Sequence, residues 1–311
     1  MADREMRAVY AQTLVQLAEH DTRICVVEAD LAKATGTGPF AKAYPDRFFN
    51  VGVAEANLVG VASGLSATGK KPFAATFACF ASRRAYDQFF LSANYAGLNV
   101  VLVGTDPGVT AAFNGGTHMP LEDLTLMRVI PGLVIVEPSD PVSLQATVRM
   151  AAERSGCTYL RLQRKPAPDR YPEGERFEFG KAKVLRQGTD VTLVALGALM
   201  VGEALKAADM LAADGIKATV LDAYTLAPLD KDTILKHAKA SGRVVTCENH
   251  RVTGALGGAV AELLAEAGVP ARLARIGVGA DQFGEVGTQD WLADHFKLTA
   301  PHIVDAAKSL R

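Results

Sequence analysis

Short, mainly apolar runs alternate along the chain with longer segments whose apolar residues recur at helical spacing. The runs that predict strands in the first half lie at residues 23–27, 48–51, 71–77, 98–103, 133–136 and 158–162. Helical spacing predicts helices at residues 4–19, 55–67, 82–94 and about 140–154. Short apolar runs are typical of strands buried on both faces. The alternation therefore indicates an α/β fold, a parallel sheet with helices on both faces.

This pattern is interrupted at residues 165–179, KPAPDRYPEGERFEF, which contain three prolines and many charges. Such a composition is typical of an interdomain linker. A second α/β block follows, with strands expected at 191–196, 218–221 and 243–246 and helices near 200–213, 230–240 and 254–267. We therefore expect a first domain at residues 1–165, a linker at 166–180 and a second domain at 181–311.

Composition and charge narrow the class of protein. Of the 311 residues, 49% are hydrophobic and 22% are charged, which is typical of globular proteins and sufficient for two cores. The formal net charge of −1 creates no global field that would attract nucleic acid or an anionic membrane. The first residues, MADREMRAVY, lack the apolar segment of a signal peptide, and no apolar run is long enough to span a bilayer. We expect a soluble cytoplasmic protein.

Four cysteines are separated by long gaps and form no C-x-x-C pair: Cys25, Cys79, Cys157 and Cys247. Cys25 and Cys247 lie in or directly after apolar runs. We expect free, mostly buried thiols and no zinc site, because no Cys/His cluster has ligand spacing.

Acidic, aromatic and imidazole side chains follow the expected strands of the first domain. Asp30 follows the strand at 23–27, Glu55 follows 48–51, Phe77 and Phe80 follow 71–77, and His118 lies beyond 98–103. Each residue alone has an ordinary structural explanation. Asp30 can cap a turn, Glu55 can be an acid favoured in the first turn of a helix, the two phenylalanines can be core residues, and His118 can be a surface imidazole. In open α/β sheets, however, ligands bind beyond the carboxyl ends of the strands. Their shared edge therefore favours a site, and no such set recurs in the second domain.

The loop at 104–118, GTDPGVTAAFNGGTH, is long for a connection between a strand and a helix. Loops of this length in compact domains are often functional. Gly115 and Gly116 permit unusual backbone angles directly before His118. We expect this loop to contribute to the site.

The sequence from Gly52 to Asn57, GVAEAN, resembles the pyrimidine-binding domain of transketolases. The resemblance continues through FAATFACF (73–80), RRAYDQ (83–88), GGTHMPLEDLTLMRVIPGLVIVEPSD (115–140), YLRLQR (159–164), VTLVALGALM (191–200), CENHRVTGALGGAVAELLAE (247–266) and FGEVGT (283–288). It covers nearly the whole chain, and G-V-x-E together with T-H-x-P-x-E-D is a specific combination. It implies a thiamin-diphosphate-binding pyrimidine domain followed by a transketolase C-terminal α/β domain.

The resemblance implies a role for each residue near the cofactor. Glu55 would hydrogen-bond the aminopyrimidine of thiamin diphosphate and so promote activation of the thiazolium carbon. Phe77 and Phe80 would wall the pyrimidine by stacking. Asp30, in the ADL element, would lie near the cofactor at a subunit contact. Arg83 stands where many family members have a tyrosine beside the pyrimidine.

Three further residues correspond to substrate contacts. The resemblance implies that His118 hydrogen-bonds the carbonyl and hydroxyl oxygens of the substrate. Arg164 matches an arginine that binds the far phosphate of sugar substrates, although a surface arginine near the linker remains the structural alternative. Asn114 stands in place of an aspartate that contacts a sugar hydroxyl.

Other phosphate-binding positions of the family are changed in this chain. Met6, with Arg7 beside it, stands for an arginine, Ala34 for a serine and Thr105 for a histidine. The donor and acceptor can therefore differ from the usual pentose and hexose phosphates. A branched, sulfonated or otherwise modified ketose is an open possibility.

The motif that holds Mg²⁺ and the diphosphate in this superfamily, G-D-G with a downstream asparagine, is absent from the sequence. Mg²⁺ requires carboxylate, carbonyl and phosphate oxygens in octahedral geometry. The chain resembles the C-terminal two-thirds of a transketolase encoded separately. We therefore expect the Mg²⁺ ligands on a partner, an N-terminal transketolase subunit, with self-association into a heterotetramer.

Two alternatives remain open at this point. One is another enzyme of the superfamily, either the β subunit of a 2-oxoacid dehydrogenase or a fragment of 1-deoxyxylulose-5-phosphate synthase, which RRAYDQ resembles. T-H-M-P-L-E-D favours a split transketolase instead. The other alternative is a non-catalytic regulatory paralogue, which would be expected to lose Glu55 or His118, and both are present.

Overall fold

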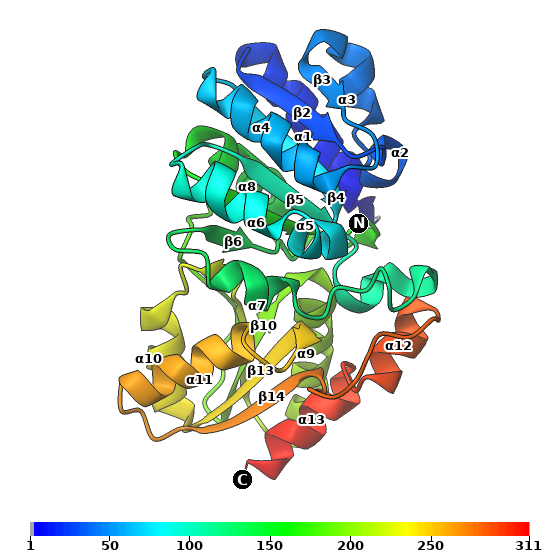
Figure 1. Cartoon of the computed structure of the whole chain (residues 1–311). Helices are drawn as coiled ribbons and strands as arrows, with labels where there is room; N and C mark the ends of the chain where they lie inside the picture. Colours follow the sequence, from blue (N-terminus) through cyan, green and yellow to red (C-terminus); the bar gives the residue numbers. More distant parts are fainter. Residues whose placement is uncertain (1–2, 311) are drawn as a thin grey trace.

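The computed structural model describes residues 3–310 and contains two α/β blocks, one above the other in Figure 1. In this part of the chain the first block is built on a seven-stranded sheet in the order β12-β6-β7-β5-β4-β2-β3. The parallel strands of this sheet are β2 (Ile24–Glu28), β3 (Phe48–Asn50), β4 (Lys71–Phe77), β5 (Val101–Thr105), β6 (Val134–Val136) and β7 (Thr158–Leu162). Their shared direction places all their carboxyl ends at one edge.

Helices cover both faces of this sheet, as the apolar runs predicted. On one face lie α1 (Met6–His20) and α8 (Pro141–Glu153), which contact each other, and on the other lie α4 (Glu55–Ala67), α5 (Ala78–Arg83), α6 (Tyr86–Gln88) and the π-helix η2 (Phe89–Tyr95). Val26 and Val27 show why both faces need cover, because adjacent residues of β2 enter two different apolar clusters. The short elements of this block are β1 (Arg4–Glu5), α2 (Ala32–Thr35), α3 (Gly38–Ala43), η1 (Pro45–Arg47), η3 (Gly108–Asn114) and α7 (Asp123–Arg128).

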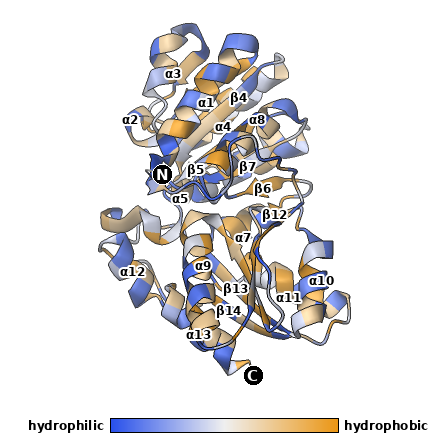
Figure 2. Ribbon diagram, turned by 180° about the vertical axis from the view of Figure 1, so that it is seen from behind, coloured by the Kyte–Doolittle hydropathy of each residue, from blue (hydrophilic) through white to orange (hydrophobic). Residues whose placement is uncertain are grey.

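The second block has a five-stranded sheet within the described residues, in the order β14-β13-β10-β11-β9. Its strands are β9 (Lys183–Arg186), β10 (Val191–Leu196), β11 (Ala218–Asp222), β13 (Arg243–Arg251) and β14 (Arg272–Val278), of which β9 is antiparallel. Its helices are α9 (Gly197–Ala213), α10 (Lys231–Ser241), α11 (Leu256–Glu266), α12 (Gln289–His295) and α13 (Ala300–Ser309). Figure 2 shows the helices of both blocks with mixed polar and apolar positions, as expected for elements with one face on a core.

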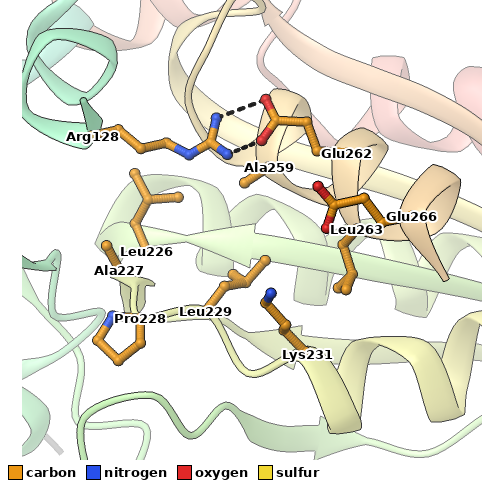
Figure 3. A pocket seen from close by; sticks show the side chains of 10 residues that line it. All are labelled: Arg128, Leu226, Ala227, Pro228, Leu229, Lys231, Ala259, Glu262, Leu263 and Glu266. Carbon is orange, nitrogen blue, oxygen red and sulfur yellow. Dashed lines mark hydrogen bonds and ion pairs between the residues drawn. The ribbon is translucent and has the colours of Figure 1, made fainter. Parts of the chain in front are cut away.

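The two blocks share backbone and side-chain contacts. Strand β12 (Thr225–Ala227) comes from the second half of the chain but pairs antiparallel with β6. Arg128 of α7 donates to the Gly254 carbonyl at 3.0 Å and forms an ion pair with Glu262 of α11, beside a cavity of about 270 Å³ (Figure 3). The blocks are therefore joined by specific contacts along the face where they meet.

The α/β fold class is confirmed, and most predicted strands and helices have the predicted positions. The helix expected at 82–94 is instead the series α5, α6 and η2. The segment expected as a linker is partly built into the fold, since β8 (Pro166–Ala167) pairs with β1 and Tyr171 is buried. No pattern predicted β14, because its burial is only partial and its arginines break the apolar run.

Two further expectations concern the cysteines and the membrane. All four cysteines are free and buried. Within residues 3–310, no helix combines the length and apolar character that crossing a membrane requires.

Candidate functional site

Glu55 begins α4 directly after β3, at the carboxyl edge of the first sheet. The sharp turn between them uses Gly52, whose φ of 74° is accessible to glycine at low cost. A carboxylate in the first turn of a helix is favoured by the helix dipole. The Glu55 side chain is 4% exposed, and Nη1 of Arg84 lies 3.3 Å from both carboxylate oxygens. The result is a nearly buried carboxylate with one cationic neighbour.

Two phenylalanines and a histidine gather beside this carboxylate. Phe77 ends β4 and Phe80 lies in α5, with ring centroids 6.0 Å apart. The His118 ring meets both edge-on, at 5.1 Å from Phe80 and 6.0 Å from Phe77. His118 Nδ1 lies 2.9 Å from the Thr117 hydroxyl. Residues from two separate segments, 77–80 and the loop that carries His118, therefore form one apolar and imidazole-lined surface, as the shared sheet edge predicted.

Arg84 joins Glu55 to this aromatic group. Its guanidinium lies over the Phe80 ring, 4.0 Å from the centroid, while it contacts the Glu55 carboxylate. Sequence reasoning did not single out Arg84 and selected Arg83 instead. The available signal was the spacing, because residues four apart on a helix share a face, as Phe80 and Arg84 do.

Arg83 faces the loop that carries His118. It forms an ion pair with Glu122 and donates to the carbonyls of Thr117 at 3.5 Å and Met119 at 3.4 Å. These contacts brace the backbone on both sides of His118. Arg83 therefore contacts the loop, whereas Arg84 contacts Glu55 and Phe80. A contact of Arg83 with the cofactor stays a prediction.

Asp30 lies at the same sheet edge in an exposed turn. Its backbone has a φ of 62°, which aspartate tolerates better than most residues. The Asp30 amide donates to Oδ1 of Asn50, and Nδ2 of Asn50 donates to the Asp30 carboxylate, both at 3.0 Å. Asn50 thus fixes the turn that follows β2 and leaves the Asp30 side chain accessible.

Arg164 and Asn114 line a neighbouring cavity of about 640 Å³, together with Lys165 and Gln289. The Arg164 Nε donates to the buried carboxylate of Asp106, and its guanidinium lies 5.4 Å from the Phe77 ring centroid. Within residues 3–310, the two terminal nitrogens of Arg164 have no hydrogen-bond partner. The cavity therefore lies beside the aromatic group, and the Arg164 guanidinium in its wall has donors free for a ligand.

The positions that differ from the family have local roles. Met6 is fully buried, and Thr105 is buried with its hydroxyl 3.4 Å from the Thr76 carbonyl. Arg7, beside Met6, donates to the carbonyls of Lys33 at 3.4 Å and Ala34 at 3.2 Å. Arg7 thus braces the short helix α2.

These side chains fit the ring end of thiamin diphosphate. A nearly buried carboxyl group can share a proton with a ring nitrogen in a hydrogen bond, and half-buried phenylalanine rings can stack on a pyrimidine. Within residues 3–310, no group of three or more His, Cys, Asp or Glu side chains could hold a metal ion. The geometry is therefore that of a site for an aromatic ligand that can form hydrogen bonds.

Comparison with known proteins finds transketolase domains along most of the chain. Residues 2–169 match the family described as "Transketolase, pyrimidine binding domain", and residues 180–303 match "Transketolase, C-terminal domain". The chain is 49% identical to the 6-deoxy-6-sulfo-D-fructose transketolase subunit SqwH of Clostridium sp. (strain MSTE9), over 97% of this chain and 93% of that protein. It is 39% identical to the 1-deoxy-D-xylulose-5-phosphate synthase of Heliobacterium modesticaldum, but spans only 46% of that protein.

Solved structures show the same fold. A split gene transketolase, described as an inactive β4 tetramer, superposes with a TM-score of 0.91 at 44% identity and 98% coverage of both chains. The transketolase of Pichia stipitis superposes with a TM-score of 0.82 at 22% identity, over 100% of this chain and 46% of that chain, so the match spans about half of that protein and not the expected two-thirds. The chain therefore belongs to the transketolase family and matches the subunit that carries the pyrimidine-binding and C-terminal domains of its split members.

Proposed function

We propose that this chain is the cofactor-activating subunit of a two-subunit transketolase that transfers a two-carbon ketol unit from an anionic ketose to an aldose. The convergence of Glu55, Phe77, Phe80 and His118 at one sheet edge carries the proposal. Thiamin diphosphate supplies the carbon nucleophile of ketol transfer when it is bound. The protein supplies the groups that orient it and move protons.

Glu55 is the proposed activating group. Its carboxyl group lies nearly buried at the start of α4, and it can exchange a proton with a pyrimidine nitrogen through a hydrogen bond. In the free chain the Glu55 carboxylate forms an ion pair with Arg84. The Arg84 side chain is 53% exposed, so its guanidinium can move into water when a cofactor ring takes its place beside the carboxyl group.

His118 is the proposed contact for the substrate oxygens. His118→Ala should slow ketol transfer by about a hundredfold, the usual cost of removing one donor to a developing oxyanion. Cofactor binding should change little, because Glu55, Phe77 and Phe80 remain. Steady-state kinetics and cofactor titration of the reconstituted enzyme measure both effects. Loss of cofactor affinity with normal turnover of the loaded enzyme would contradict this role.

Arg164 and Lys165 support an anionic substrate. Both line the cavity beside the aromatic group, which the carboxylate of Asp290 lines as well. A guanidinium matches a phosphate or sulfonate through paired hydrogen bonds. The relative from Clostridium is described as acting on a sulfonated fructose, which makes a sulfonated ketose a donor to test here.

Arg164→Ala should raise the KM for an anionic ketose by about thirtyfold and change kcat much less, since one charge-assisted hydrogen bond contributes about 2 kcal/mol. Arg176→Ala, which removes an exposed arginine in the segment at 165–179, is the matched control. The informative comparison is the KM for an uncharged short ketose. An equal rise there would contradict anion binding by Arg164.

The partner is proposed to be an N-terminal transketolase subunit that holds the diphosphate and Mg²⁺, in a heterotetramer with two copies of each chain. The inactive β4 assembly described for the 44% identical structure supports this division of the site. The direct test is ketol transfer by the reconstituted pair, with phosphorylated and sulfonated ketoses as donors. Decarboxylation of pyruvate without ketol transfer would favour the 2-oxoacid dehydrogenase or synthase alternatives instead.

A further inference from the structure

The loop between β5 and α7, which carries His118, has an unfavourable backbone conformation. Positive φ angles occur at Asp106 (57°), Gly108 (51°), Ala112 (48°) and Gly115 (74°). For residues with a side chain, such angles cost free energy and persist only where surrounding contacts impose them. Two contacts from the second block of the chain hold this loop.

The first of these contacts is made by Asn249 of β13. Its Oδ1 accepts a hydrogen bond from the Val109 amide, and its Nδ2 donates to the Pro107 carbonyl, both at 2.9 Å. Asn249 is 2% exposed, so water cannot replace these bonds easily. A Cβ atom at Gly108 would lie 2.2 Å from Asn249 Oδ1, so the loop backbone is pressed against the amide.

A second contact holds the other end of the loop, directly before His118. A Cβ atom at Gly116 would lie 2.2 Å from the Gly284 carbonyl oxygen, and one at Gly284 would lie 2.9 Å from the Gly116 Cα. Arg251 fixes the turn that precedes Gly284. It donates to three carbonyls of that turn at 2.7–3.0 Å, those of Gly279, Ala280 and Gln282.

Asn249 is itself held by a buried charged cluster. Arg161 Nη2 donates to the Asn249 carbonyl at 3.0 Å. The same guanidinium pairs with Asp123 at 2.8 Å and 2.9 Å and with Glu137 at 2.8 Å, and all three side chains are at most 5% exposed. A satisfied buried network of this kind rigidifies its surroundings. The Asn249 side-chain amide, which hydrogen-bonds the loop, therefore has a fixed position.

We propose that the C-terminal domain positions His118 by clamping this loop at both ends, with Asn249 and Gly284 as positioning residues. The inference rests on the proposed role of His118 in ketol transfer. It gives the second domain a part in the reaction although none of its residues belongs to the group of Glu55, Phe77, Phe80 and His118. The bond between Asn249 and the loop fixes the start of the loop, and the contact of two glycine backbones fixes its end.

The test compares Asn249→Ala and Gly284→Ala in the enzyme reconstituted with its partner. Hydrogen exchange at residues 108–118 should become faster in both variants, because the loop opens more often. The kcat for ketol transfer should fall by about tenfold to a hundredfold, since a displacement of about 1 Å can cost that much. Exchange of the cofactor C2 proton, which depends on Glu55, should stay within about twofold of the parent, because that group is not moved.

Gly258→Ala is the matched control, because a Cβ atom at Gly258 meets nothing closer than 3.7 Å. It should leave loop exchange and turnover unchanged. Unchanged loop exchange in both test variants, or equal losses of C2 proton exchange and ketol transfer, would overturn the proposal. If Asn249→Ala does not fold, Gly284→Ala still decides the question. Hydrogen exchange decides it independently of His118, whose role His118→Ala tests separately.

Discussion

The purified chain is expected to fold and self-associate but to bind thiamin diphosphate weakly and to catalyse no ketol transfer until its partner is added. The proposed site explains this result. Glu55, Phe77 and Phe80 provide for the pyrimidine, and the sequence contains no G-D-G motif for the diphosphate and Mg²⁺. An unneutralised diphosphate is poorly held by a chain whose formal net charge is −1. Cofactor binding and ketol transfer should therefore both require this chain and its partner together.

Calorimetric titration of the isolated chain with thiamin diphosphate in the presence of Mg²⁺ measures the first half of this expectation. Ketol transfer before and after addition of the partner measures the second. The partner alone is the control and should be equally inactive, since it lacks the activating carboxylate. Micromolar or tighter cofactor binding together with turnover by the isolated chain would show that this chain holds the diphosphate by other groups.

The carboxyl edge of the first sheet could be predicted from sequence because it depends on local patterns. Each strand is a short apolar run, and parallel strands bring their ends together. Glu55, Phe77 and His118 lie far apart in the chain, yet each follows such a run. Their convergence therefore required only the strand positions and the direction of the sheet.

Contacts between the two blocks could not be predicted in this way. Asn249 lies beyond the strand predicted at 243–246 and carries no local signal for binding Pro107 and Val109, which are 142 and 140 positions earlier. Gly284 matters because another glycine opposes it, and only the packed structure reveals that pairing. Strand β12 was also missed, because its partner β6 belongs to the other block. Each of these features depends on how the two sheets meet.

Glu55→Gln tests the activating role most directly. The substitution keeps the shape and one hydrogen-bonding oxygen but removes the group that can take and return a proton. We expect turnover to fall by at least about a hundredfold, and by as much as about ten-thousandfold, the range found for general acid–base groups. Exchange of the cofactor C2 proton in the reconstituted enzyme should fall with it, because activation precedes every later step.

The ion pair with Arg84 requires a control, because Glu55→Gln also removes that contact. Arg84→Ala breaks the same pair and keeps the carboxyl group, so it should keep most of the C2 exchange rate. Thermal unfolding of both variants should be measured alongside, because Arg84→Ala leaves a carboxylate that is only 4% exposed without its cationic neighbour. If Glu55→Gln retained near-normal C2 exchange, or if Arg84→Ala lost as much, the carboxyl group would not be the activating group. A loss confined to Glu55→Gln assigns cofactor activation to this single side chain.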